Sequence, residues 1–175
     1  MHRNVIMLRS IGGTMVFAVI GILSWVYFIN DWRLSLPLGI FYVTLLFNTY
    51  FSIRLFSSVT PPDNRVQTVL DVLLFVSYVL IALNVWSVPR FIFFSLLMFI
   101  IATLKYAFLL NAVPHPKLLK RKIAVDLLGT FVLALALGGA LAGFLLTSAW
   151  LMAAVFLAAN IILFSVHPLY RLDNE

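Results

Sequence analysis

Long apolar stretches separated by short polar breaks run through almost the whole chain. Four of the five breaks contain a charged residue, a proline or both. Each stretch has about the 20 residues that a helix needs to cross the hydrocarbon core of a bilayer. The pattern predicts an all-α integral membrane bundle of six transmembrane helices, at residues 11–29, 34–56, 66–86, 90–111, 123–146 and 149–166.

The break between the last two stretches is the weakest. Residues 145–150 contain no charge and no proline, so residues 123–166 can also be read as one long bent segment. Two helices are favoured because about 40 apolar residues exceed what one crossing needs. Residues 1–175 then form a single polytopic membrane domain.

The amino-acid composition adds that lipid, and not water, surrounds the predicted helices. Hydrophobic residues make up 63% of the 175 residues and charged residues only 10%, whereas soluble domains carry about 25% charged residues. A soluble fold of this size cannot bury so much apolar surface, and lipid removes the problem. The absence of cysteine excludes disulfides, thiolate nucleophiles and cysteine metal sites.

Basic residues predict the orientation, because loops on the cytoplasmic side of a membrane are enriched in Lys and Arg. With six crossings, the side that both termini share holds nine of them, the other side holds only Arg33 and Arg90, and Lys105 lies inside a span. Both termini are therefore predicted to be cytoplasmic, and the inner membrane of a prokaryote is the favoured location. The four tryptophans map to the opposite interface, where this residue type is enriched: Trp25, Trp32, Trp86 and Trp150.

A weak internal repeat suggests three helical hairpins of roughly 55 residues. Asp71 comes ten residues after Pro61, and Asp126 comes ten residues after Pro116. Apolar sequences align with themselves easily, so duplication and chance similarity are both open. Repeats of this kind are common in transporter folds.

Polar residues inside the spans are the candidate functional residues, because polar groups in hydrocarbon are costly. Lys105 in the fourth span can pair with Asp71 or Asp126. Together with two asparagines they form a predicted polar layer, a candidate ion gate or solute site: Lys105, Asp71, Asp126, Asn48 and Asn160. Purely structural roles are alternatives for these residues. Lys105 can extend its stem to the headgroups, and the asparagines can serve as hydrogen bonds between helices.

A cluster of cations precedes the fifth span and is predicted to anchor it at the membrane surface. Such a cluster can also rest on anionic lipid headgroups, and it comprises Lys117, Lys120, Arg121 and Lys122. Asp126 follows Lys122 by four residues, which predicts a surface ion pair on one helix face.

Small residues in the fifth span mark a predicted helix contact. Gly139 and Gly143 form a G-x-x-x-G pair, which allows close approach of the sixth span or of a second copy of the chain. Spans two and four are rich in Phe, Leu and Ile all round, which indicates surface facing lipid or a partner.

Sequence alone favours a non-catalytic membrane protein, an accessory or structural subunit that packs against partner helices of a larger complex or against itself. The alternative is a small channel or transporter that uses the polar layer around Lys105 and Asp71. No enzyme constellation, cofactor motif or nucleic-acid patch is evident. His115 and His167 both precede proline at the same predicted surface, but they lack a carboxylate at ligand spacing, so a metal site is not expected.

Overall fold

Six helices form the computed structural model, which describes residues 2–29, 31–59, 65–110 and 116–163. They are α1 (His2–Phe28), α2 (Trp32–Val59), α3 (Arg65–Leu83), α4 (Val88–Leu109), α5 (Pro116–Leu141) and α6 (Leu145–Ile161). No strand occurs among the described residues. The all-α membrane-type bundle predicted from the sequence is confirmed.

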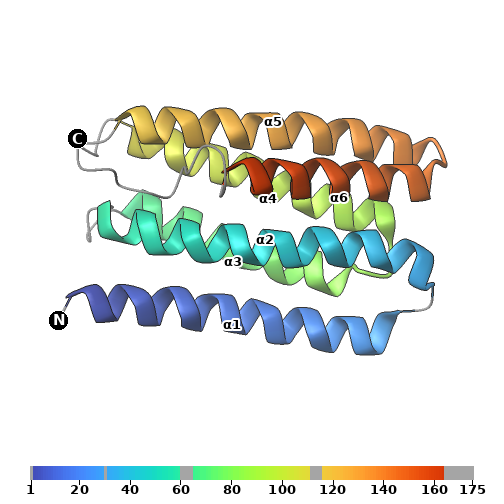
Figure 1. Cartoon of the computed structure of the whole chain (residues 1–175), viewed down its shortest axis with the longest axis horizontal. Helices are drawn as coiled ribbons and strands as arrows, with labels where there is room; N and C mark the ends of the chain where they lie inside the picture. The colour runs from blue at the N-terminus through green and yellow to red at the C-terminus, as the bar shows by residue number, and fades with distance from the viewer. Residues whose placement is uncertain (1, 30, 60–64, 111–115, 164–175) are drawn as a thin grey trace.

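Five of the helices, α1 to α5, are long and apolar enough to cross a membrane, and α6 is a shorter apolar helix. Consecutive helices run in opposite directions (Figure 1). One end of the bundle carries all four tryptophans, near the ends or turns of α1, α2, α3, α4 and α6, and is called the tryptophan end. The opposite end, where α3 and α5 begin and α2 and α4 end, is called the basic end.

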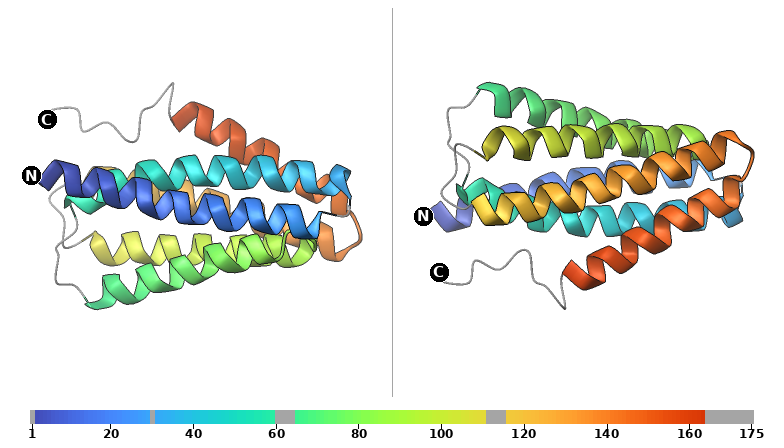
Figure 2. Two further views of the ribbon diagram at one scale, coloured as in Figure 1. Left: turned by 90° about the horizontal axis from the view of Figure 1, so that it is seen from below. Right: turned by 90° about the horizontal axis from the view of Figure 1, so that it is seen from above.

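The helices close into a ring. Around it, α1 packs on α2, α2 on α6, α6 on α5, α5 on α4, α4 on α3, and α3 on α1. Figure 2 shows that α3 is inclined to its neighbours, so that its N-terminal end lies farther from α1 and α2 than its C-terminal end. Tyr42 of α2 donates a hydrogen bond to the Phe17 carbonyl of α1 at 2.9 Å.

A large apolar core fills the bundle from its middle to the tryptophan end. Phe41 is completely buried, and its ring packs against those of Phe91 and Phe156. A small second cluster, called the basic-end cluster, lies near the other end and joins α2, α4 and α5: Leu55, Phe56, Tyr106, Leu109 and Leu119.

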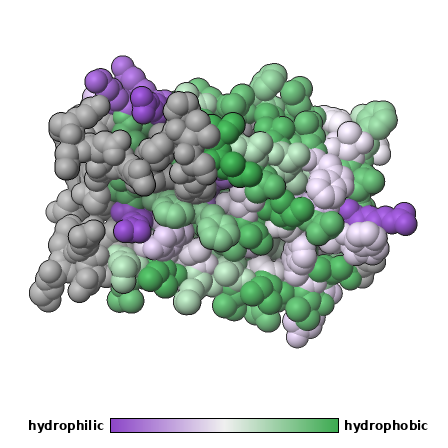
Figure 3. Space-filling model, viewed as in Figure 1, coloured by the Kyte–Doolittle hydropathy of each residue, from purple (hydrophilic) through white to green (hydrophobic). Residues whose placement is uncertain are grey.

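The outer surface between the two ends is largely apolar, as Figure 3 shows for one face. Exposed apolar side chains are found on all six helices, among them Leu23, Phe47 and Phe131. In water this surface would be strongly unfavourable, whereas hydrocarbon solvates it. Helices α2 and α4 differ from expectation, because Phe41, Phe91 and other large side chains on them are buried in the core; α4 packs against four other helices.

The turn between α5 and α6 corrects two sequence expectations. The break lies at residues 142–144, before the predicted site, and Gly143 has a φ of 95° there. The Phe144 amide donates to the Gly139 carbonyl at 2.9 Å and the Gly143 amide to the Ala140 carbonyl at 3.2 Å. This is a Schellman motif, whose left-handed residue is usually glycine. Gly143 therefore ends a helix and does not form a packing pair with Gly139.

Gly139 itself does lie against α6. A Cβ atom at this position would come within 2.6 Å of the Ser148 hydroxyl oxygen, so a larger residue would require the Ser148 side chain to shift. Even so, α5 packs more extensively on α4 than on α6.

Candidate functional site

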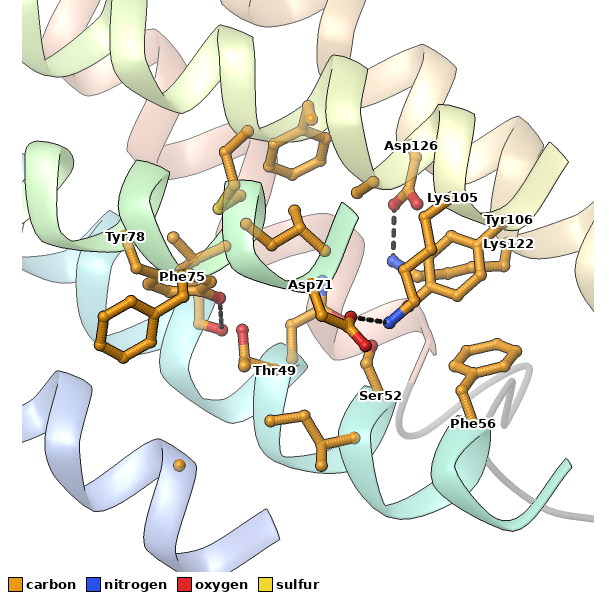
Figure 4. Close-up of a pocket in the computed structure, with 18 of the residues that line it drawn as sticks. Thr49, Ser52, Phe56, Asp71, Phe75, Tyr78, Lys105, Tyr106, Lys122 and Asp126 are labelled. Carbon is orange, nitrogen blue, oxygen red and sulfur yellow. Dashed lines mark hydrogen bonds and ion pairs between the residues drawn. The ribbon is translucent and has the colours of Figure 1, made fainter. Parts of the chain in front are cut away.

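A cavity of about 450 Å³ lies inside the bundle between the apolar core and the basic-end cluster. Helices α1 to α5 all contribute to its wall. Phe17, Tyr78 and Phe99 of the core line it on one side, and Phe56 and Tyr106 of the basic-end cluster line it on the other. Figure 4 shows polar side chains from several helices pointing into this space.

Helical periodicity brings the polar residues into the cavity. On α3, Gln67, Asp71 and Tyr78 follow each other at intervals of four and seven residues, which is one face of a helix. On α2, Asn48 and Ser52 are four residues apart and also line the cavity. Each helix thus presents a short polar stripe inward and apolar side chains outward.

An ion pair joins α3 and α4 at the cavity wall, because the Lys105 ammonium donates to Asp71 Oδ1. The Lys105 side chain is 15% exposed and that of Asp71 is 57% exposed. Gln67 Nε2 also donates to the Lys105 carbonyl, at 3.3 Å. Since Asp71 both lines the cavity and is exposed, the cavity communicates with the outside beside α3.

A second ion pair lies within α5 and is deeply buried. Lys122 Nζ donates to Asp126 Oδ1 at 2.5 Å, and the two side chains are 5% and 1% exposed. The Lys122 ammonium also lies 5.4 Å from the centre of the Tyr106 ring, within the range of a cation–π interaction. Asp126 Oδ2 is buried and has no hydrogen-bond partner among the described residues.

The position of Lys122 corrects two expectations. The other three cations of the cluster, Lys117, Lys120 and Arg121, are exposed on the first turns of α5, where they remain candidate headgroup ligands. Lys122 instead falls on the stripe of α5 that contains Leu119, Asp126 and Leu133, all of which are buried. It therefore points into the bundle, and its pair with Asp126 forms in the interior and not at the surface.

Asn160 is the one member of the predicted polar layer that does not line the cavity. It is buried on α6, and its Nδ2 donates to the Phe156 carbonyl at 2.9 Å. The residue borders two other, largely apolar pockets next to α2. The structure therefore brings Lys105, Asp71, Asp126 and Asn48 together on the wall of this cavity, whereas Asn160 shares only a separate pocket with Asn48.

Sequence reasoning missed several polar members of the cavity wall, namely Gln67, Thr49, Ser52 and Thr68. Their signal is present in the sequence, since each lies one, three or four residues from an Asp or Asn already singled out on the same helix. His115 and His167 lie outside the described residues. Within the described ranges, no group of three or more potential metal-ligating side chains lies together.

The fold and the cavity define a multi-pass helical membrane protein with a polar interior site. No family model, no curated protein and no solved structure matches this chain.

Proposed function

We propose that this protein binds a small polar solute in its central cavity and carries it across the membrane. The observation that carries the proposal is the cavity itself, in which two ion pairs face the same interior space. Small-molecule sites commonly measure about 300–1,000 Å³, and the volume of about 450 Å³ falls in this range.

Burial of the charges supports a functional role. A charged side chain inside a membrane is costly, and such residues commonly mark solute or ion pathways. Replacing a buried ion pair by apolar residues is often neutral or stabilising, so stability alone gives little reason to place Lys122 and Asp126 on the wall of a cavity. A polar solute that exchanges contacts with these groups gives such a reason.

The arrangement of the two apolar clusters fits alternating access. The apolar core closes the cavity toward the tryptophan end, and the basic-end cluster narrows it toward the other end. Within the described part of the chain, the basic-end cluster joins α2, α4 and α5 alone, whereas the inclined α3 leaves Asp71 exposed. Movement of α3 against α2 is the simplest way to widen or close the entrance.

Thiol labelling tests whether water and polar solutes reach the cavity, and the absence of native cysteine makes it clean. Ala102→Cys places a thiol at the cavity wall, and Leu104→Cys places one on the exposed, lipid-facing side of the same helix. In liposomes, a charged thiol reagent should label the first variant and leave the second unlabelled. Equal protection of both thiols would show that no hydrated cavity exists.

Solute exchange tests transport directly. Liposomes containing the protein should exchange a radiolabelled small polar solute faster than protein-free liposomes do. Lys105→Leu should abolish this exchange while the protein stays folded, and Arg54→Leu, which removes an exposed cation at the same end, should leave it unchanged. The proposal fails if Lys105→Leu exchanges solute as the unaltered protein does.

An accessory subunit is the second candidate. Helix α1 packs on α2 and α3 alone among the described helices, and it exposes many large apolar side chains, including Val19, Ile22 and Val26. Such a face suits a partner helix as well as lipid. Purification in mild detergent distinguishes the two, since a subunit should appear in a stoichiometric complex of larger mass.

A further inference from the structure

We infer that the solute of the central cavity is a small zwitterion, a molecule with one ammonium and one carboxylate group. The inference rests on the proposed solute-carrying function and names its substrate class. It follows from the balance of charge in the cavity, from one buried acceptor atom and from the position of the two ion pairs.

The charges on the cavity wall cancel. Lys105 and Lys122 supply two cations, and Asp71 and Asp126 supply two anions. A solute with a single net charge would leave this interior with an uncompensated charge, which is strongly unfavourable in a poorly solvated site. A zwitterion adds one charge of each sign, so every cation can still face an anion after binding.

Asp126 offers a place for the ammonium group. Its Oδ1 accepts a hydrogen bond from Lys122, and its Oδ2 is buried without a hydrogen-bond partner among the described residues. A buried acceptor without a partner is unfavourable. An ammonium group has three N–H donors, and the Asp126 carboxylate lines the cavity, so a bound ammonium would satisfy this oxygen.

Lys105 offers a place for the carboxylate group. Its ammonium has three N–H donors, and Asp71 Oδ1 accepts one of these hydrogen bonds. Asp71 is the more exposed partner of the pair, so it can turn toward solvent when a solute carboxylate takes its place. Lys105 lies on α4 and Asp126 on α5, which lets one solute connect two neighbouring helices.

An exchange assay with matched solutes tests the charge requirement. Liposomes containing the full chain are loaded in turn with glycine, β-alanine, γ-aminobutyrate, ethanolamine, lactate and glycerol, and exchange of each labelled solute is followed at equal concentrations. At least one of the three zwitterions should exchange about tenfold faster than ethanolamine, lactate and glycerol, since each tenfold preference needs only about 1.4 kcal/mol. The zwitterion that exchanges fastest indicates which spacing between ammonium and carboxylate groups fits the cavity.

Two variants assign the preference to the cavity. The double variant Lys122→Gln/Asp126→Asn removes both buried charges and keeps side chains that can form hydrogen bonds, and it should lower zwitterion exchange at least tenfold. Arg121→Gln changes the exposed neighbouring cation and should have no effect. Helical circular dichroism and elution volume confirm that both variants are folded.

The possible failures separate the two proposals. If ethanolamine, lactate or glycerol exchanges as fast as every zwitterion, the zwitterion inference is overturned and the carrier function stands. Zwitterion exchange that survives the double variant also overturns it. If no solute exchanges faster than in protein-free liposomes, both proposals fall.

Discussion

The two halves of the bundle have different interiors, one packed with apolar side chains and the other containing a polar cavity. Toward the tryptophan end, in what is called the solid half, Phe41 packs against Phe91 and Phe156, and apolar side chains fill the interior apart from one small pocket beside Phe41. Toward the basic end, in what is called the hollow half, Asn48 of α2, Asp71 of α3 and Lys105 of α4 line a cavity. Both halves have the same apolar exterior, so lipid exposure does not distinguish them. The difference lies only in the inward stripe of each helix.

This contrast suggests that one half stabilises the fold and the other half handles the solute. Close packing of large side chains gives a single, rigid arrangement, and the solid half holds the helices together. The hollow half lacks that interlocking and depends on ion pairs, which can exchange partners. A change in the solid half should therefore alter stability, whereas a change in the hollow half that leaves no buried charge without its partner should mainly alter solute handling.

The largest expected effect comes from separating the buried ion pair. Asp126→Leu leaves the Lys122 ammonium buried without its carboxylate partner, and it should lower the free energy of unfolding by about 3–5 kcal/mol. Adding Lys122→Met should recover most of this loss, because the double variant buries no charge. Unfolding in mixed micelles, followed by circular dichroism, measures both. A double variant as unstable as the single one would show that the pair itself stabilises the fold.

Truncation in the solid half should be nearly as damaging. Phe41→Ala removes a completely buried ring and leaves a void among Phe91 and Phe156, which should lower the free energy of unfolding by about 3 kcal/mol. Phe47→Ala on the same helix removes a ring that is 60% exposed, and it should have little effect, since lipid takes the place of the ring. The same unfolding measurement applies, and equal losses would contradict the inside–outside assignment of α2.

Two glycines of α1, Gly21 and Gly13, allow the packing of the two halves to be compared on one helix. A Cβ at Gly21 would lie 2.4 Å from the buried Tyr42 ring, whereas a Cβ at Gly13, which lines the cavity, would meet only Ile53 at 3.6 Å. Gly21→Ala should therefore lower the free energy of unfolding by about 1–3 kcal/mol, and Gly13→Ala should be neutral or slightly stabilising, as alanine favours helix. Comparable thermal stability of the two variants would argue against the packing difference.

The smallest effect on stability should come from filling the cavity. Ala102→Leu adds three carbon atoms at the cavity wall, where space exists, so the free energy of unfolding should change by less than about 1 kcal/mol. Solute exchange should nevertheless fall sharply, since the added side chain occupies the binding volume. If Ala102→Leu lowered the free energy of unfolding without slowing solute exchange, the hollow half would contribute to stability and not to solute binding.

Much of this architecture could be predicted from the pattern of apolar residues. The lengths of the apolar stretches predicted the helices, and the positions of the tryptophans predicted their common end. Gly143 was misjudged because G-x-x-x-G spacing does not distinguish a packing face from a helix end, which depends on a backbone φ. Lys122 was misjudged because its neighbours in sequence are surface cations, whereas its neighbours on the helix face are Leu119 and Asp126.

Only part of the polar layer was predicted correctly, for a similar physical reason. Residues at equal depth can meet only if their helices face the same space. Asn48 and Lys105 meet this condition because α2 and α4 border the cavity. Asn160 does not line this cavity, since α6 packs between α2 and α5 and this residue borders other pockets, one of which it shares with Asn48. Depth follows from sequence, but the order of helices around the ring does not.

The placement of the two ion pairs also bears on how the chain enters the bilayer during synthesis. Lys122 and Asp126 lie one turn apart on α5, so this helix can neutralise its own charges before it meets any neighbour. Asp71 and Lys105 lie on different helices, and each would enter hydrocarbon alone if its helix were inserted singly. The translocation machinery should therefore release α3 and α4 together as a hairpin, whereas α5 can leave it unaccompanied.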